Sequence, residues 1–399
     1  MAEESKLDLV DATEKRFRTD PSPKPEYPNS KDALKEMESG NSALNDKVKK
    51  KKNKGKGKES EDTEFTTKLP TVMKKSKGKY KIESPYEWIT CMISSDDMCA
   101  QVGKLLKDNY SSVGACDYSN EFLRWALQPP GYRKDWLIGV RVMPSSTLVG
   151  FISAVPAMIS VDGDLVEMAE INIVCVKKDH RNKGICTAMI KELTTRVGGG
   201  HTALINYKHV PTSIPTVTCQ YWNNTLIHVL PTGGEVVGER FREMKPDDVP
   251  SVTHLLNGYL SRFRVRPVFD EDTVSHWFLP RQGIVSSFVR ASGEKLTDFG
   301  SFYWQRVNQR VDKKLLNIKY GCMFYYASVE TVENVIRYLV KVARESNLDA
   351  FSIVRAMELE ESFLTKLHFE KGDSFHYHLP SCVTGVDPLD IGLLIKALE

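Results

Sequence analysis

The sequence contains no run of apolar residues long enough to span a bilayer, which takes about 18 or more. Its first residues, Met1–Ser5, lack the apolar segment of a secretory signal. The eight cysteines are scattered, with no Cys-x-x-Cys pair or His–Cys spacing typical of zinc sites. These absences predict a soluble cytoplasmic protein with reduced thiols, no metal site and no membrane span.

The first 80 positions are also poor in aromatic residues. Eight of the twelve residues from Lys47 to Lys58 are lysine. Such a composition cannot bury enough apolar surface to order itself, so residues 1–80 are predicted to form a disordered Lys-rich tail. The tail suits docking on a polyanion, such as the ribosome, another nucleic acid or acidic lipid. A targeting signal and a merely solubilising extension are the alternatives.

The rest of the chain has the composition of a globular protein, with 41% hydrophobic residues and a formal net charge of +3 over 399 residues. Order is expected from about Ser84 onward. Helices are predicted from Ser94–Asp97 onward and over Asn120–Leu127, strands over Trp136–Val142 and Thr147–Val161, and a hairpin turn at Asp162–Asp164.

The most informative stretch is an apolar strand pattern, Glu170–Val176, followed by a basic turn, Lys177–Gly184, and an amphipathic helix, and Thr202–Tyr207 is predicted as the strand after this helix. The glycines at 198–200 are typical of a helix end. The helix pattern places five residues on one face: Cys186, Met189, Ile190, Leu193 and Val197.

Cations beside a helix N-terminus favour the binding of phosphate or pyrophosphate. Arg181, Lys183 and Gly184 occupy this position, and the Arg-x-x-Gly-x-small spacing resembles the pyrophosphate arm of acyl-CoA-dependent N-acyltransferases. An ordinary strand–turn–helix with surface charge is the alternative. His180 is interpreted as an exposed loop residue rather than a base. Cys175 is interpreted as a packed thiol rather than an acyl carrier, because direct transfer to an amine needs no such intermediate.

A second strand–helix–strand pattern follows about 150 residues later. It comprises Gly321–Ala327, Val329–Arg344 and Leu348–Val354. Two such units predict an α/β (α+β) protein in which two related halves pack side by side.

From about residue 84 to its end, the chain resembles the glycylpeptide N-tetradecanoyltransferase (protein N-myristoyltransferase) family. The stretches that carry the resemblance are Tyr86–Trp88, Ser94–Cys99, Asn109–Tyr110, Glu121–Tyr132, Leu148–Ser153, Met168–Asn172, Thr218–Trp222, His276–Pro280 and Thr297–Phe299. The resemblance implies two fused acetyltransferase-like (GNAT) halves: residues 81–240 binding acyl-CoA, and residues 241–399 supplying most of a peptide groove.

The implied reaction moves a myristoyl group from myristoyl-CoA, a co-substrate, to the N-terminal glycine amine of nascent proteins. No cofactor is bound permanently, and the protein is expected to be a monomer. The resemblance assigns the backbone N–H groups of Ile173 and Val174 to the thioester oxygen and the terminal carboxylate, here of Glu399, to general base catalysis. It assigns acyl-CoA contacts to Ile173, Val174, Cys175, Val176, Arg181, Asn182, Lys183, Gly184, Ile185 and Cys186.

The sequence also departs from the family. The segment after Tyr221-Trp222 is about twenty residues shorter, and Ser352–Arg355 replaces Asn-Ala-Leu-Asp, which exchanges an acid for a base. Ile391–Ile395 matches the family's buried C-terminal tail, and Lys396–Glu399 extends beyond it. Three functions are therefore compared: an active N-myristoyltransferase, a weak or inactive paralogue that binds acyl-CoA or partner proteins, and an N-acyltransferase of other acyl specificity.

Overall fold

The computed structural model describes residues 82–110, 115–198, 201–205, 216–225, 241–311, 314–378 and 386–392. The predicted Lys-rich tail and Glu399 lie outside these ranges. The first part contains β1 (Tyr86–Thr90), α3 (Asp96–Asn109), β2 (Ala115–Cys116), α4 (Asn120–Leu127), β3 (Leu137–Val142), β4 (Thr147–Val161), β5 (Asp164–Val176), α5 (Ile185–Val197), β6 (His201–Ile205) and β7 (Thr216–Thr225). The second contains β8 (Phe241–Glu243), α6 (Val249–Leu260), β9 (Val265–Pro267), α7 (Glu271–Phe278), β10 (Val285–Ser292), β11 (Lys295–Val311), β12 (Lys314–Ser328), α8 (Val332–Glu345), β13 (Ala350–Arg355), α9 (Glu361–Lys366) and β14 (Glu370–His378).

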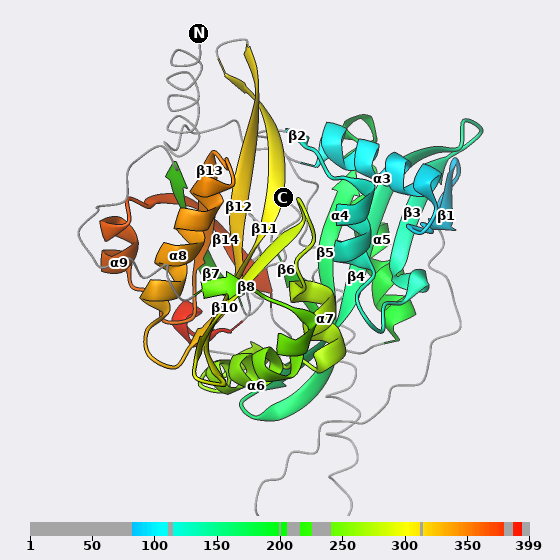
Figure 1. Cartoon of the computed structure of the whole chain (residues 1–399). Coiled ribbons are helices and arrows are strands. Elements are labelled where there is room, and N and C mark those ends of the chain that lie inside the picture. The colour runs from blue at the N-terminus through cyan, green and yellow to red at the C-terminus, as the bar shows by residue number, and fades with distance from the viewer. Residues whose placement is uncertain are drawn as a thin grey trace, which may run out of the picture.

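The strands form one twisted sheet that runs through both parts of the chain (Figure 1). Its order is β1-β3-β4-β5-β6-β14-β7-β13-β12-β11-β10-β8, with β9 paired to β4 and β2 to β11. Only β5–β6 and β12–β13 are parallel neighbours among the described strands. These are the strands joined through helices, since a parallel pair needs a crossover connection.

Both predicted strand–helix–strand units are confirmed, as β5–α5–β6 and β12–α8–β13. The second strand-to-helix turn is longer than predicted, because α8 begins at Val332 rather than Val329. The predicted hairpin joins β4 to β5, and positive φ angles at Asp162 (50°) and Gly163 (98°) give the turn its shape.

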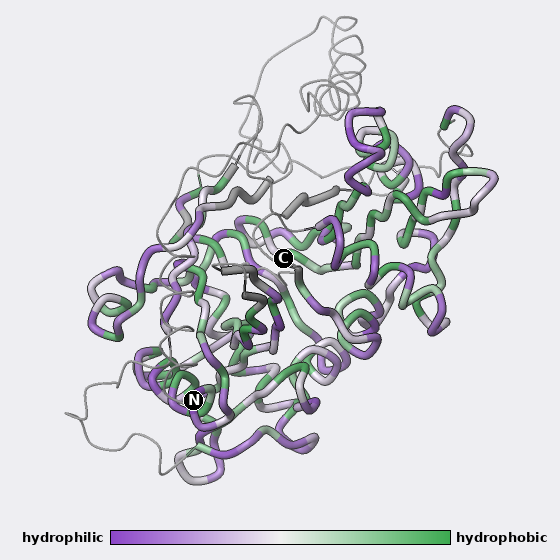
Figure 2. Tube along the Cα trace, turned by 90° about the horizontal axis from the view of Figure 1, so that it is seen from above, coloured by the Kyte–Doolittle hydropathy of each residue, from purple (hydrophilic) through white to green (hydrophobic). Residues whose placement is uncertain are grey.

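Helices cover both faces of the sheet in the first part. On one face, α5 packs Ile185, Met189 and Leu193 against the apolar side chains of β3, β4 and β5. On the other face, α3 packs Val102 and Leu105 into a second core, which continues across α4 into the later helices. Hydrophobic residues follow the inner strands and hydrophilic residues the outer turns (Figure 2).

The two parts are joined by strand pairing and by several polar contacts, among them the Arg264–Asp162 ion pair at 2.8 Å. β7 pairs with β14 on one side and β13 on the other. The Trp125 indole donates to the carbonyl oxygen of His276 at 3.1 Å, and the His276 ring pairs with the Trp125 carbonyl at 2.8 Å. The domain boundary at 240/241 stays a prediction. No helix in the described ranges is long and apolar enough to cross a membrane.

Candidate active site

A β-bulge interrupts the pairing of β4 with β5. Ala154 pairs with Ile171 and Ser153 with Ile173, which leaves Asn172 as one extra residue on β5. A bulge bends the strand and disrupts the ladder locally. The bulge therefore falls immediately before the two residues, Ile173 and Val174, whose backbone N–H groups are predicted to bind a thioester oxygen.

Buried polar groups hold this bulge in place. The Ser153 hydroxyl donates to Asn172 Oδ1 at 2.8 Å, and both residues are buried. Tyr110 contributes a longer bond to the Asn172 carbonyl, at 3.5 Å. The Asn172 Nδ2 group is buried and has no hydrogen-bond partner among the residues that the structure describes. Because an unpaired buried donor is costly, this amide is a group that a bound substrate would satisfy.

The strand edge beyond the bulge is open in the described structure. β6 pairs with β5 only from Met168 to Ile171, so its described pairing stops where the bulge begins. Ile173 is completely buried and Val174 is partly exposed. Backbone groups at the open edge of a fixed, largely apolar strand are suited to bind a carbonyl oxygen that gains negative charge.

The basic loop after β5 leads directly into an uncapped helix. A 3₁₀ turn, Lys178–His180, is followed by left-handed backbone at Asn182 (φ 59°) and Gly184 (φ 73°). Gly184 is the N-cap of α5, and no side chain caps the helix. A Cβ at this glycine would contact nothing within 4 Å, so the backbone conformation is what favours glycine there. Among the described residues, no side-chain hydrogen bond caps the start of α5, and a helix N-terminus of this kind is suited to bind an anion.

Arg181 also has a structural role, which its position in the sequence did not reveal. Its Nε donates to the Val176 carbonyl at 3.2 Å, and its Nη2 donates to the Asn109 carbonyl at 2.5 Å. Asn109 in turn accepts a bond from the Lys178 amide at 2.9 Å. Arg181 therefore ties the end of β5 to the end of α3. These two bonds use two of the five N–H donors of Arg181, so its remaining donors and its charge are what it could offer a ligand.

Cys175 and His180, the other two residues singled out by the sequence, lie in different environments. Burial raises the pKa of the Cys175 thiol to about 12, and its sulfur lies 3.9 Å from the Leu105 carbonyl oxygen. A thiol so buried has almost no thiolate, which favours its interpretation as packed core. His180 is half-buried rather than exposed as predicted, because Tyr86 of β1 covers it: its Nδ1 lies 3.1 Å from the Tyr86 hydroxyl.

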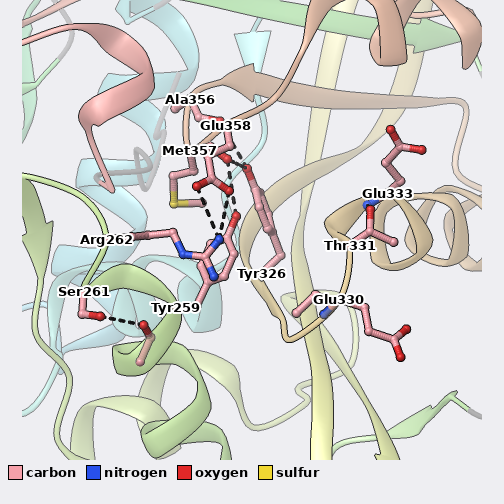
Figure 3. Close-up of polar contacts among 12 residues, drawn as sticks. Tyr259, Ser261, Arg262, Tyr326, Glu330, Thr331, Glu333, Ala356, Met357 and Glu358 are labelled. Atoms are coloured by element: carbon pink, nitrogen blue, oxygen red, sulfur yellow. Dashed lines mark hydrogen bonds and ion pairs between the residues drawn. The ribbon is translucent and has the colours of Figure 1, made fainter.

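The equivalent helix of the second unit, α8, has a side-chain cap at its N-terminus. Thr331 caps α8 by accepting a bond from the Glu333 amide at 3.3 Å, and Glu330 precedes the cap. Glu330, Thr331 and Glu333 lie together there (Figure 3). Carboxylates at a helix N-terminus are favourable to the helix but repel a phosphate. Among the described residues, α5 therefore has the helix start better suited to an anionic ligand.

Figure 3 also shows the hydrogen bonds and the ion pair that hold the turn after β13. The Tyr326 hydroxyl donates to the carbonyls of Ala356 (3.2 Å) and Met357 (3.1 Å). Burial raises the pKa of Tyr326 well above its usual value, so the hydroxyl stays a donor. Arg262 pairs with Glu358 at 3.1 Å. These contacts hold the left-handed backbone of Met357 (φ 51°) and Glu358 (φ 70°).

The structure brings the predicted site residues into one continuous stretch, with the exception of Glu399. Ile173–Val176 form the end of β5, Arg181–Gly184 the loop, and Ile185 and Cys186 the first turn of α5. Ile185 is buried in the core, so its ligand contact would come from the backbone. Sequence reasoning missed Asn172, Ser153 and Asn109. A polar residue inside an apolar strand pattern was the available signal for Asn172.

A bulged strand, unpaired on its β6 side beyond the bulge among the described residues, is thus followed by a helix that has no side-chain cap and has adjacent cations. Together with the mixed sheet of two strand–helix–strand halves, this arrangement defines an acetyltransferase-like acyltransferase.

Comparison with known proteins identifies the family. The profile of the N-terminal domain of myristoyl-CoA:protein N-myristoyltransferase matches residues 66–210, and that of the C-terminal domain matches residues 223–380. Glycylpeptide N-tetradecanoyltransferase 1 of Arabidopsis thaliana is 38% identical over 354 residues, which cover 79% of this chain and 80% of that protein. Glycylpeptide N-tetradecanoyltransferase 2 of Bos taurus is 32% identical over 350 residues, covering 79% and 70%.

A solved structure agrees with the sequence matches. Saccharomyces cerevisiae N-myristoyltransferase with bound myristoyl-CoA superposes with a TM-score of 0.70 and 25% identity, covering 82% of this chain and 94% of that one. The chain belongs to the myristoyl-CoA:protein N-myristoyltransferase family, and the fold inferred from its sequence is confirmed.

Proposed function

We propose that this protein transfers a myristoyl group from myristoyl-CoA to the α-amine of an N-terminal glycine. The observation that carries the proposal is the bulge at Asn172, beyond which β5 has no described partner on its β6 side, followed by the basic loop that leads to the start of α5. Family membership supplies the donor and the acceptor. The yeast relative was solved with myristoyl-CoA bound, and the curated relatives are named for transfer to glycylpeptides.

The reaction follows from these groups. The N–H groups of Ile173 and Val174 bind the thioester oxygen and stabilise the charge that develops when the amine attacks the carbonyl carbon. The C–S bond then breaks, and CoA leaves as a thiolate. The acyl-CoA contacts are assigned to Ile173–Val176 and to Arg181–Cys186, where the phosphates meet Lys183 and the first N–H groups of α5.

The glycine ammonium must lose a proton before or during attack, and the terminal carboxylate of Glu399 is proposed as the base. Glu399 lies outside the described residues, but the approach to it is anchored. Ile391 forms a parallel bridge with Val265, and the Gly392 amide donates to the Val265 carbonyl at 2.7 Å. A displacement of about 1 Å is costly in proton transfer. The extension Lys396–Glu399 is therefore expected to lower the rate.

The test is a reaction of purified protein with myristoyl-CoA and a Gly-initiated peptide, read by mass spectrometry of the peptide and by release of CoA. An Ala-initiated peptide is the control. A series of acyl chain lengths tests for other acyl specificity. Ending the chain near Ile395 or Lys396 should raise the single-turnover rate, and ending it at Leu393 should lower it. A rate that does not change across this series would contradict the proposal that Lys396–Glu399 displace the terminal carboxylate.

The extension after Ile395 also favours a second candidate, a paralogue that binds acyl-CoA without efficient turnover. Tight binding of myristoyl-CoA with no acylpeptide in any of the shortened proteins would support this candidate over the enzyme.

We further propose that the protein acts as a cytoplasmic monomer and that its Lys-rich tail docks on the ribosome. Removing residues 1–80 should abolish salt-sensitive co-sedimentation with ribosomes and leave the melting temperature of the remainder unchanged. Retention of salt-sensitive sedimentation without the tail would contradict this assignment.

A further inference from the structure

The cations of the loop after β5 are not equally placed to meet a ligand. Arg181 points inward to two backbone carbonyls. Lys177 pairs with Asp179 at 3.8 Å. Lys178 and Lys183 are exposed, and Lys183 directly precedes the glycine that starts α5. The loop therefore offers fewer available permanent charges than its sequence suggests.

His180 lies in the middle of this group and is oriented from outside the loop. The Tyr86 hydroxyl of β1 meets its Nδ1 at 3.1 Å, and the two rings contact edge to face with centroids 5.8 Å apart. Its Nε2 has no hydrogen-bond partner among the described residues. A tyrosine hydroxyl can donate to a neutral imidazole and accept from a protonated one. The orientation of the ring can thus survive a change in its charge.

The electrostatic environment of this ring opposes its protonation in the free protein. Partial burial, then the charges of Lys183 and Lys177, lower the pKa of His180 below its ordinary value, and Asp179 opposes the shift weakly. The group that faces the ring from β1 is Tyr86, and Lys183 directly precedes Gly184, the N-cap of α5. A bound phosphate reverses this balance, because it brings negative charge to the same cations.

We propose that His180 is a further ligand of the acyl-CoA phosphates, which takes up a proton when acyl-CoA binds and then contributes a cation through Nε2. This inference rests on the proposed function, since it takes the phosphates of acyl-CoA as the ligand. Binding coupled to proton uptake strengthens as pH falls, and the added affinity is lost as pH rises above the pKa of the complex. The sensitive window for histidine is about pH 6 to 8.

The test measures proton uptake by calorimetry of myristoyl-CoA binding, without peptide, in buffers of different ionisation enthalpy. His180→Gln removes the titration and His180→Arg makes the cation permanent. His254→Gln is the matched control, because His254 is exposed on α6. Myristoyl-pantetheine, which has no nucleotide phosphates, is the control ligand. Melting temperatures check that each variant is folded.

The parent should take up on the order of half a proton more than His180→Gln near pH 7, and the His254 variant should match the parent. His180→Gln should bind about 3- to 10-fold more weakly near pH 6.5 and about equally near pH 8.5. His180→Arg should bind tightly at both values with no excess uptake. Myristoyl-pantetheine should show no uptake.

Equal proton uptake and equal affinity in parent, His180→Gln and His180→Arg would overturn the assignment of His180 while leaving the proposed function intact. A parent that binds no myristoyl-CoA would overturn both.

Discussion

The two strand–helix–strand units have the same connectivity but use their polar groups differently. The first strand of each unit, β5 or β12, forms a long hairpin with the strand before it and carries a bulge. A buried serine lies opposite this bulge, Ser153 in the first unit and Ser301 in the second. Ser301 bonds the backbone of Tyr325 twice, donating to its carbonyl (3.1 Å) and accepting from its amide (3.2 Å). Ser153 bonds the Asn172 side chain instead. In the second unit the serine bonds the backbone at the bulge, whereas in the first it bonds a side chain.

The helix starts differ in the same sense. α8 has a threonine cap and neighbouring carboxylates, and α5 has a glycine N-cap and neighbouring cations. The second unit thus bonds or caps the positions that, in the first unit, are proposed to bind the thioester oxygen and the phosphates. The comparison indicates that a binding site in this fold is made as much by leaving backbone groups unpaired as by adding side chains.

The largest expected effect is on the stability of the second part of the chain, through the ion pair between β10 and β11. The carboxylate of Asp298 is fully buried and accepts bonds from Arg290 at 2.6 Å and Ser328 at 2.7 Å. Arg290→Met should lower the free energy of unfolding by about 3–5 kcal/mol, because it leaves a buried charge without its partner. Denaturant titration measures this. Lys341→Met, which breaks an exposed pair with Glu345, is the control and should cost less than about 0.5 kcal/mol. Equal losses would contradict the prediction.

The next largest effect is expected on catalysis, through the bulge of β5 at Asn172. Asn172→Ala removes the acceptor of the Ser153 hydroxyl, which can then bond backbone at the bulge, as Ser301 does. Single-turnover acyl transfer should fall roughly 10²- to 10³-fold, the cost typical of losing an oxyanion donor. Affinity for acyl-CoA should change little. Ser301→Ala, its counterpart, should cost about 1–3 kcal/mol of stability without slowing transfer at matched acyl-CoA occupancy. Slowing by both variants alike would remove the distinction between the two bulges.

A smaller effect is expected at the helix starts. Lys183→Glu places a carboxylate before α5, as Glu330 stands before α8, and acyl-CoA affinity should fall about tenfold, with weaker salt dependence. Lys183 is the cleaner test than Arg181, whose replacement would also break the link between β5 and α3. Glu330→Lys is the reciprocal variant, and titration with acyl-CoA should show no change for it. Unchanged binding by Lys183→Glu would place the phosphates elsewhere.

The smallest effect is expected for Cys175. Its pKa of about 12 leaves on the order of 10⁻⁴ to 10⁻⁵ of the thiol ionised near neutral pH, and alkylation of the folded protein should be very slow. The thiolate fraction rises tenfold per pH unit until the pKa is reached, so alkylation should accelerate accordingly. Cys175→Ala should retain the transfer rate within about twofold, because no acyl-cysteine forms. Loss of transfer in a folded variant would reinstate the covalent route.

The parts of the fold that sequence could predict are those controlled by local pattern. The helix over Asn120–Leu127, the strand that ends at Val176 and the glycine that ends α5 at 198 all have the predicted positions. Each depends on periodicity, turn residues or helix ends within a few positions.

What sequence could not predict depends on contacts between distant segments. Asn172 became an extra residue only because β4 pairs on both sides of it. The charge of Arg181 was visible, but its direction was set by the Asn109 carbonyl, 72 positions earlier. The single sheet across both halves was likewise absent from the pattern, since pairing between β6 and β14 or β7 and β13 leaves no local signal.

The place of β7 in that sheet has a consequence for how the chain folds as it is synthesised. β7 (Thr216–Thr225) is made with the first half, but its strand partners, β13 and β14, end at Arg355 and His378. At about 5–20 residues per second, more than a hundred further residues take on the order of ten seconds to appear. During this interval both edges of β7 lack their native partners, and unpaired edges invite association with other chains. The first half is therefore expected to need a chaperone until the second emerges, and the halves should not fold when expressed apart.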